Sequence, residues 1–151
     1  MAIYVKEPVL TYKQRVIDAE SRKVSKPEDV IPFVRELYGL GIERFMVLYL
    51  DSKNKIRGIK SIADGTVNQV NPTVREVFRY GIGMDAASIV VAHNHPSGDP
   101  EPSREDKDWV KTCMKGGEAL GIKVLDFIIL ARDDGNTEKY YSFADHSLMS
   151  G

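Results

Sequence analysis

The sequence predicts one α/β domain of three layers, in which helices cover both sides of a mixed central sheet. Apolar, strand-like runs alternate along the chain with amphipathic helical patterns. The length of 151 residues suits one hydrophobic core. A content of 42% hydrophobic and 28% charged residues is that of an ordinary globular protein.

The first expected elements are an amphipathic helix and a β-hairpin. Residues 27–40 repeat apolar side chains at helical spacing, and glycines mark the end of the segment. Residues 43–50 (ERFMVLYL) are strand-like, and a turn at 51–54 leads into a second strand over 56–62. Residues 1–26 show weak periodicity, so we expect them to form an N-terminal arm or an edge strand.

The second half of the chain reads as two further helices and three strands. Asn71-Pro72 predicts a helix start, with a capping side chain followed by proline, and this helix should run to about Gly83. Residues 87–92 (ASIVVA) predict a strand buried on both faces. The remaining elements are expected to be a helix from Ser103 to Leu120, a buried strand at 122–131, a turn at 133–136 and a last strand at 139–143.

Charge and composition argue against several classes of protein. The net charge of -1 gives no overall electrostatic footprint for nucleic acid. The local basic cluster of Lys53, Lys55, Arg57 and Lys60 is better interpreted as a solvated hairpin than as a DNA-binding surface. No run of about 18 apolar residues is present, so we expect no membrane partner.

Cysteine usage indicates a reducing compartment. Cys113 is the single cysteine, so no disulfide can form within the chain, and we expect a cytoplasmic protein. The N-terminus lacks the long apolar stretch of a signal peptide. Because Cys113 lies in a helical pattern, a small buried residue is favoured over a nucleophile.

A pair of histidines follows the predicted buried strand, in the string His93-Asn94-His95-Pro96. Two imidazoles one residue apart at a strand end can turn toward one point if the chain bends there. Pro96 and Gly98 supply such a bend. The loop also lies at the carboxyl end of a central strand, where α/β sheets place ligand sites.

A carboxylate is expected close to these histidines. Asp106 comes eleven residues after His95, and if Ser103 caps the helix, Asp106 is the third helical residue. Zinc accepts two imidazole nitrogens and a carboxylate oxygen, which leaves a fourth position for water, as in catalytic sites. The sequence therefore predicts a site for one Zn²⁺ per chain, with His93, His95 and Asp106 as ligands.

Each of these residues also has a plainer interpretation. Ser103 could be only an N-cap, Asp106 only a first-turn carboxylate favoured by the helix dipole, and either histidine a hydrogen-bonded core or loop residue. Asn94, Ser97 and Asp99 either shape a substrate entrance or are merely polar loop residues. The joint pattern, rather than any single residue, favours a metal site.

The spacing also resembles a known family. The string His93-x-His95-Pro96-x6-Ser103-x2-Asp106 resembles the JAMM (MPN+/JAB) metalloprotease motif, and HNHPSGDPEPSRED, at 93–106, resembles its RadC branch. The strings GTVNQVNPTVREVF and KYYSF are similar to that branch as well, so the resemblance covers residues 27–148.

The resemblance implies a fold, a reaction and two further residues. Residues 27–151 would form a JAB/MPN domain, a cytidine-deaminase-like sandwich. Glu43, which by position matches the family's upstream glutamate on the first hairpin strand, would be the general base that takes a proton from the attacking water. Ser103 would donate a hydrogen bond to the developing oxyanion. Without the resemblance, Glu43 would be interpreted as a surface carboxylate at a strand start.

Two departures from the RadC branch stand out. That branch usually begins with a helix-hairpin-helix module, and the 26 residues before the matching part are too few for one, which weakens the expectation of DNA binding. The branch commonly has Asp-His in its penultimate strand, where this chain has Asp126-Phe127. Asp126 could support a ligand histidine or simply be hydrogen-bonded within its strand, and His146 is expected to be an exposed tail residue.

Three functions therefore compete. The first is a zinc-dependent hydrolase of peptide or isopeptide bonds, with a peptide or protein as its substrate. The second is a DNA-repair or DNA-processing factor of the RadC type, which the near-neutral charge does not support. The third is a non-enzymatic interaction module, which the presence of every motif residue disfavours.

Overall fold

The structure, a computed structural model, describes residues 1–64 and 71–149. Its centre is a five-stranded sheet in the order β2-β1-β3-β4-β5, in which β3 and β4 are parallel and the other neighbours antiparallel. The strands are β1 (Arg44–Leu50), β2 (Ile56–Asp64), β3 (Ser88–Asn94), β4 (Lys123–Arg132) and β5 (Glu138–Ser142). The helices are η1 (Pro27–Asp29), α1 (Ile31–Val34), η2 (Arg35–Gly39), α2 (Val74–Gly83) and α3 (Arg104–Leu120).

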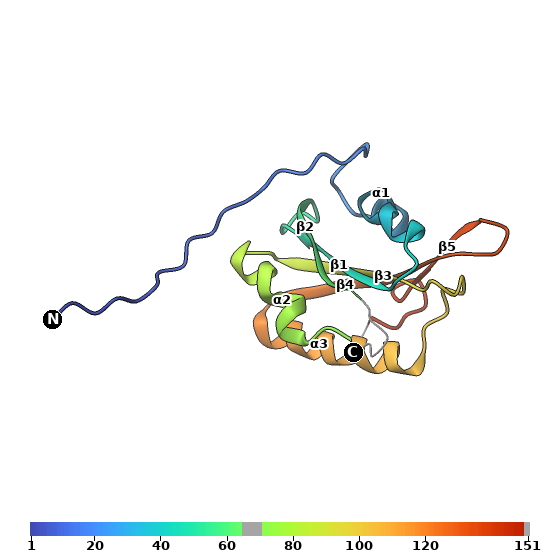
Figure 1. The fold of residues 1–151 in the computed structure, drawn as a ribbon. Helices are drawn as coiled ribbons and strands as arrows, with labels where there is room; N and C mark the ends of the chain where they lie inside the picture. The colour runs from blue at the N-terminus through green and yellow to red at the C-terminus, as the bar shows by residue number, and fades with distance from the viewer. Residues whose placement is uncertain (65–70, 150–151) are drawn as a thin grey trace.

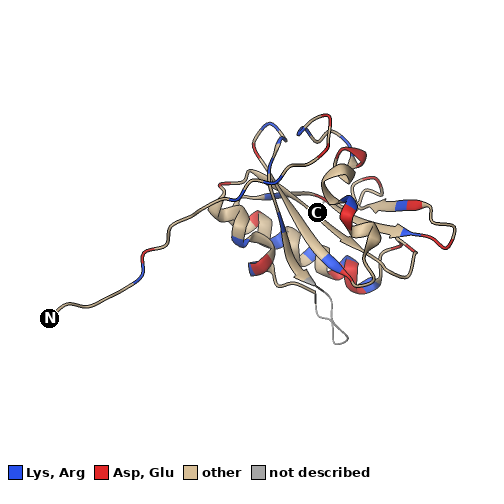
Figure 2. Ribbon diagram, turned by 45° about the horizontal axis from the view of Figure 1, so that its top comes forward, with Lys and Arg blue, Asp and Glu red and all other residues tan. Residues whose placement is uncertain are grey.

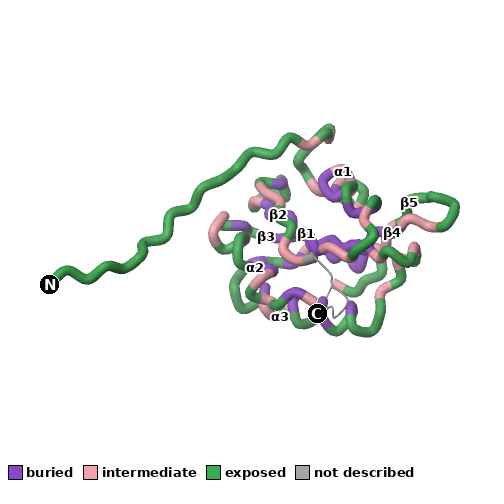
Figure 3. Tube along the Cα trace, viewed as in Figure 1, coloured by how far each residue is buried: buried purple, intermediate pink, exposed green. Residues whose placement is uncertain are grey.

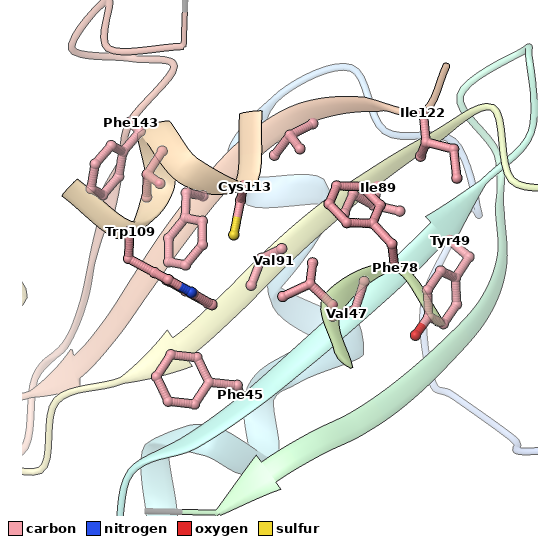
Figure 4. Packing of buried hydrophobic residues seen from close by; sticks show 14 of the residues in the cluster. Phe45, Val47, Tyr49, Phe78, Ile89, Val91, Trp109, Cys113, Ile122 and Phe143 are labelled. Atoms are coloured by element: carbon pink, nitrogen blue, oxygen red, sulfur yellow. The ribbon is translucent and has the colours of Figure 1, made fainter. Parts of the chain in front are cut away.

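Helices lie on both faces of this sheet, as Figure 1 shows, so the predicted three-layer α/β sandwich is confirmed. One face packs against α2 and α3 through alternate strand residues such as Val47, Ile89 and Val91 (Figure 4). The opposite face packs against the short helices before β1. The strand residues on this face, such as Leu48 and Val90, alternate along the strands with those of the first face. This alternation follows from the two-residue period of a strand.

The central strand β3 is buried along its whole length, as the apolar run predicted. It continues two residues past the expected end at Ala92, because pairing with β4 extends to Asn94 and Leu130. His93 therefore belongs to the strand itself and is fully buried. The parallel connection from β3 to β4 runs through α3, the crossover helix that such a pair requires.

Two helix predictions need correction. The expected single helix at 27–40 is divided into η1, α1 and η2. Pro32 has no N–H to donate to the preceding turn, and Val34 has a non-helical backbone with φ -124°. The predicted start at Asn71-Pro72 comes two residues early, because Thr73 is the N-cap and its side chain accepts a hydrogen bond from the backbone N–H of Glu76.

Residues 1–22 contain no helix or strand, and the N-terminal end of this segment points away from the sheet (Figures 1 and 3). Further along it, the Tyr12 hydroxyl donates to the carbonyl oxygen of Gly83, and Ile17 and Ala19 pack against the core. Where this arm meets the β1–β2 hairpin, Lys23 forms an isolated antiparallel bridge with Lys55. Within residues 1–26 this bridge is the one strand-like pairing that the structure describes. None of the helices within the described ranges is long and apolar enough to cross a membrane.

Candidate metal centre

Four side chains from three separate segments converge at the carboxyl end of β3. Glu43, His93, His95 and Asp106 each offer one nitrogen or oxygen atom, and these atoms all lie within 4.8 Å of one another. The structure thus brings together the three predicted ligands and the predicted base. Among the described residues this is the one such group of potential metal ligands.

The sheet positions the two histidines. His93 is paired with Phe45 of β1 on one side and with Ile129 of β4 on the other. Beyond the strand, the backbone N–H of His95 donates to the carbonyl oxygen of Leu130 at 2.8 Å. The chain then turns at Gly98, whose φ of +91° favours glycine, and a Cβ there would lie 2.9 Å from the backbone oxygen of Arg132.

The first turn of α3 positions the carboxylate. Ser103 is the N-cap: its hydroxyl accepts a hydrogen bond from the backbone N–H of Asp106 at 3.0 Å. In return, Oδ2 of Asp106 accepts from the backbone N–H of Ser103 at 2.8 Å. This capping box fixes the Asp106 carboxylate at the helix start, where the predicted third helical position would place it.

The acceptors around the two imidazoles determine where their protons lie. Nδ1 of His93 lies 2.6 Å from Oε1 of Glu43, and Nδ1 of His95 lies 2.9 Å from the backbone oxygen of Asp99. A carboxylate and a carbonyl can only accept, so both Nδ1 atoms carry the proton. In a neutral imidazole the lone pair is then on Nε2, whereas a protonated His95 donates a hydrogen bond from Nε2 to Asp106. Both Nε2 atoms face Asp106.

This arrangement fits a small divalent metal. Nε2 of His93 is buried and has no hydrogen-bond partner within the described chain, as expected for an atom whose partner is a metal. Nε2 of His95 lies 3.2 Å from Oδ2 of Asp106, and Nε2 of His93 lies 3.7 Å from Oδ1. Ligand atoms at zinc distances in a tetrahedron are separated by about 3.3 Å.

The electrostatics of the site favour an ionised carboxylate. Burial alone would raise the pKa of Asp106, but the hydrogen bond with His95, the proximity of His93 and the Ser103 N–H lower it to about 2. Burial likewise opposes the charged form of His95, yet its bonds to Asp106 and to the Asp99 backbone raise its pKa overall. In the absence of metal, Asp106 thus carries a negative charge that attracts a cation.

Aromatic side chains enclose the His93 ring, and the sequence reasoning did not anticipate them. Phe45 stacks on it with ring centroids 4.7 Å apart, and Phe127 meets it edge-on at 5.4 Å. Trp109 of α3 contacts both of these rings, and Figure 4 shows Trp109 beside Phe45. One signal was available in the sequence: Phe127 lies in an apolar strand run, and its side chain packs in the same core cluster as Phe45 and Trp109.

Glu43 lies one residue before β1 rather than on the strand. Its side chain is 20% exposed, against 0% for His93, so the carboxylate sits between the buried imidazole and solvent. One oxygen accepts the His93 bond, and a carboxylate has a second oxygen that can accept from a water. Ser103 is exposed, and its hydroxyl hydrogen can donate while its oxygen caps α3.

The other residues singled out from the sequence have structural roles. Asp126 accepts hydrogen bonds from the backbone of Phe127 and Ala144 and from the Ser142 hydroxyl, so it supports its strand and the following turn rather than a ligand histidine. His146 is exposed as expected, but it stacks on Tyr141 with ring centroids 4.0 Å apart. Cys113 is buried, and burial raises its pKa to about 12, which disfavours a nucleophile.

Comparison with known proteins agrees with this geometry. The family model described as the RadC-like JAB domain matches residues 24–148. The chain belongs to the RadC-like JAB domain family. Its membership accounts for the α/β sandwich and for the group of potential metal ligands at the end of β3.

Curated relatives of this RadC-like JAB protein carry the name UPF0758 protein. One from Caldanaerobacter subterraneus subsp. tengcongensis is 44% identical over 82% of the chain and 55% of its own length. Others, from Methanosarcina mazei and Carboxydothermus hydrogenoformans, are 39% and 42% identical over 88% and 82% of the chain, and 56% and 53% of their own lengths. The chain thus spans about half the length of the curated relatives that it matches.

Proposed function

We propose that this RadC-like JAB protein is a zinc-dependent hydrolase of the JAMM type that cleaves an amide bond in a peptide or in an isopeptide linkage. The observation that carries the proposal is the pair of buried or half-buried Nε2 atoms that face an ionised Asp106. Two imidazoles and one carboxylate are the donor set of catalytic zinc sites, whereas calcium and magnesium prefer oxygen ligands.

Each residue has a defined task in this reaction. His93, His95 and Asp106 would hold the metal, which when bound polarises the scissile carbonyl and lowers the pKa of water. Glu43 takes a proton from the attacking water as the new C–O bond forms. It then delivers that proton to the departing amine as the C–N bond breaks, so that protons balance. The Ser103 hydroxyl donates a hydrogen bond to the developing oxyanion.

A single group of potential ligands among the described residues supports amide over phosphodiester chemistry. Nucleases and phosphatases commonly use two metals about 4 Å apart to stabilise both the attacking and leaving oxygens. A single metal flanked by a carboxylate base is the arrangement of zinc peptidases. The expected partner is therefore a peptide or protein, and we propose that the protein acts in the cytoplasm, where an unpaired cysteine remains reduced.

The experiment that tests this function compares the zinc-loaded parent with E43Q. Both proteins are incubated with peptides and with isopeptide-linked peptide pairs, and new amine and carboxyl ends are detected by mass spectrometry. The parent is expected to produce them and E43Q to be slower by at least about 100-fold, with both proteins holding one zinc. Equal rates would contradict the assignment of Glu43, and no cleavage by a zinc-loaded parent would contradict the function.

A second candidate, DNA processing, is favoured by one local feature. The Val24 N–H donates to the Asn54 carbonyl at 2.9 Å, and the Ile56 N–H donates to the Arg22 carbonyl at 2.8 Å. These bonds bring Arg22 and Lys23 of the arm to the basic hairpin that carries Lys53, Lys55 and Arg57. Elsewhere on the ribbon charges of both signs are interspersed (Figure 2).

The salt dependence of binding tests this second candidate. A phosphate-binding surface would hold labelled single- or double-stranded DNA with an affinity that falls steeply as salt rises, and R22A/K55A would reduce the slope by about two. An absence of binding at low salt would remove the candidate without affecting the hydrolase proposal.

A further inference from the structure

Asn94 lies between the two histidines in the sequence, and its side chain is committed to the segment that carries Glu43. The side chain is nearly inaccessible, since Asn94 is only 2% exposed. Its Oδ1 accepts a hydrogen bond from the backbone N–H of Arg44 at 2.8 Å, and its Nδ2 donates to the backbone oxygen of Ile42 at 2.9 Å. The carboxamide thus binds the backbone on both sides of Glu43.

We propose that Asn94 is a positioning residue that fixes Glu43 relative to the metal ligands. The inference rests on the proposed function, because it concerns the base of that reaction. Within the described residues, the hydrogen bonds of the Asn94 side chain go to the backbone of Arg44 and Ile42 and not to a ligand nitrogen or to the Glu43 carboxylate. It acts through the backbone of Ile42 and Arg44, whose spacing sets where the Glu43 side chain begins.

The two hydrogen bonds of the Asn94 carboxamide, here called the clamp, lie just beyond the end of regular pairing between β1 and β3. The antiparallel ladder between β1 and β3 ends at the pair Phe45 and His93. One residue further along, the Asn94 carboxamide takes the place of a backbone peptide, with one donor and one acceptor directed at the opposing strand. Glu43 precedes β1, so the Asn94 side chain holds the backbone around Glu43 against β3 where the strand ladder no longer does.

The chemistry of the two partners makes asparagine specific here. A backbone N–H requires an acceptor and a carbonyl requires a donor, so the orientation of the Asn94 carboxamide is determined. Aspartate would keep the acceptor for Arg44 but lose the donor to Ile42, and serine is too short to bridge both. A buried carbonyl left without its donor is unfavourable, so the backbone around Glu43 would shift.

The position of Glu43 has two consequences for the site. Its carboxylate holds the Nδ1 proton of His93, which keeps the Nε2 lone pair on the metal side. The same carboxylate must also reach the attacking water. Because Asn94 is the last residue of β3 and lies between His93 and His95, the residue that holds the base is in the same segment as both ligand histidines.

The test uses N94D and N94S, with N54D as the matched control. Asn54 lies in the exposed β1–β2 turn, at the opposite end of β1 from Glu43, so N54D makes the same chemical change away from the site. N94S removes the clamp without adding a negative charge, which separates positioning from electrostatic effects. Circular dichroism establishes that each variant is folded, and N94S serves alone if N94D does not fold.

Kinetics and zinc binding form the first readout. We expect both Asn94 variants to lower kcat by about 10- to 100-fold, the range expected for a catalytic group displaced by up to about 1 Å. KM and the zinc stoichiometry should stay close to those of the parent and of N54D. An unchanged kcat in both folded variants, or an equal loss of kcat and zinc, would overturn the positioning role.

A second readout does not need an active enzyme. In the metal-free protein with ¹⁵N-labelled histidine, the hydrogen-bonded Nδ1 proton of His93 should give a resolved NMR signal, which E43A identifies by removing it. This signal should shift or broaden in the Asn94 variants and stay in place in N54D. If the parent binds zinc but cleaves nothing, the hydrolase proposal fails, and an unmoved signal would separately overturn the role of Asn94.

Discussion

His93 and Glu43 form a partly buried pair in which Nδ1 of the imidazole lies 2.6 Å from Oε1 of the carboxylate. His93 is fully buried and Glu43 is partly exposed, so the pair connects the interior of the sheet with solvent. The carboxylate selects the tautomer that presents Nε2 to Asp106. One residue can therefore serve both the metal and the reaction, and its two effects can be separated by substitution.

Replacing Glu43 with alanine or glutamine separates these effects. The carboxamide oxygen introduced by E43Q would still accept the His93 proton, whereas the methyl group left by E43A would not. E43A is expected to lower zinc affinity by about 10- to 100-fold, the usual effect of removing a carboxylate behind a ligand histidine. E43Q is expected to lose far less affinity. Competition with a zinc chelator measures both values, and equal affinities for the two variants would mean that the Glu43–His93 bond does not support the metal.

The S103G variant tests the Ser103 hydroxyl apart from its capping role. Glycine is a tolerated N-cap, so the loss of stability should be a few tenths of a kcal/mol, against about 1 kcal/mol for S103A. Without a hydroxyl to stabilise the oxyanion, S103G should lower kcat by about 100-fold or more. Thermal unfolding and steady-state kinetics provide the two measurements. If kcat instead falls in proportion to the loss of stability, so that S103A has a much lower kcat than S103G, Ser103 only caps α3.

The pKa of Asp106 predicts an acid-sensitive contribution to stability in the metal-free protein. A carboxylate whose folded pKa is about 2, below its ordinary 3.8, stabilises the fold above pH 4. This contribution is lost as the pH falls from about 4 to about 2 and amounts to roughly 2 kcal/mol. Urea unfolding should show D106N less stable than the parent at pH 5, with the two converging near pH 2.

E105Q is the control for this experiment, because Glu105 is the exposed carboxylate next to Asp106 in the same turn. Its stability relative to the parent should vary little over the same pH range. If the difference between D106N and the parent stays constant from pH 5 to pH 2, the ionised Asp106 does not contribute as described.

The turn at Gly98 predicts a loss of metal binding in G98A. Its positive φ disfavours a side chain, and a Cβ would contact the backbone oxygen of Arg132. The distortion should move the His95 segment and weaken zinc binding by about tenfold or more, consistent with about 1–3 kcal/mol of strain. G39A, at a glycine with open space around its Cβ and no positive φ, should leave zinc binding unchanged. Similar affinities for both variants would contradict this account of the loop.

The sequence predicted the order of the elements and the three-layer class because strand and helix periods are strong along this chain. It predicted the convergence of His93, His95 and Asp106 because the strand end, the bend and the N-cap each have a local signature. It did not predict the division of the helix at 27–40, where the apolar pattern persists although Pro32 and Val34 interrupt the hydrogen bonding.

The contacts across the sheet were beyond local reasoning. The stacking of Phe45 on His93 and the bonds from Asn94 to Ile42 and Arg44 depend on the register of β1 against β3. Register is a tertiary property that no short string of residues encodes. For this reason Asn94 was interpreted from sequence as an entrance or loop residue, whereas the structure buries it beneath the Glu43 segment.

The central claim is that His93, His95 and Asp106 hold one catalytic zinc. The most direct measurement is a crystal structure of protein purified without added metal, with anomalous data collected on both sides of the zinc absorption edge. The account predicts one zinc peak per chain, bonded to Nε2 of both histidines and to a carboxylate oxygen of Asp106, with a coordination position open to solvent. A site without metal in protein that also fails to take up added zinc, or a zinc ion bound elsewhere, would contradict it.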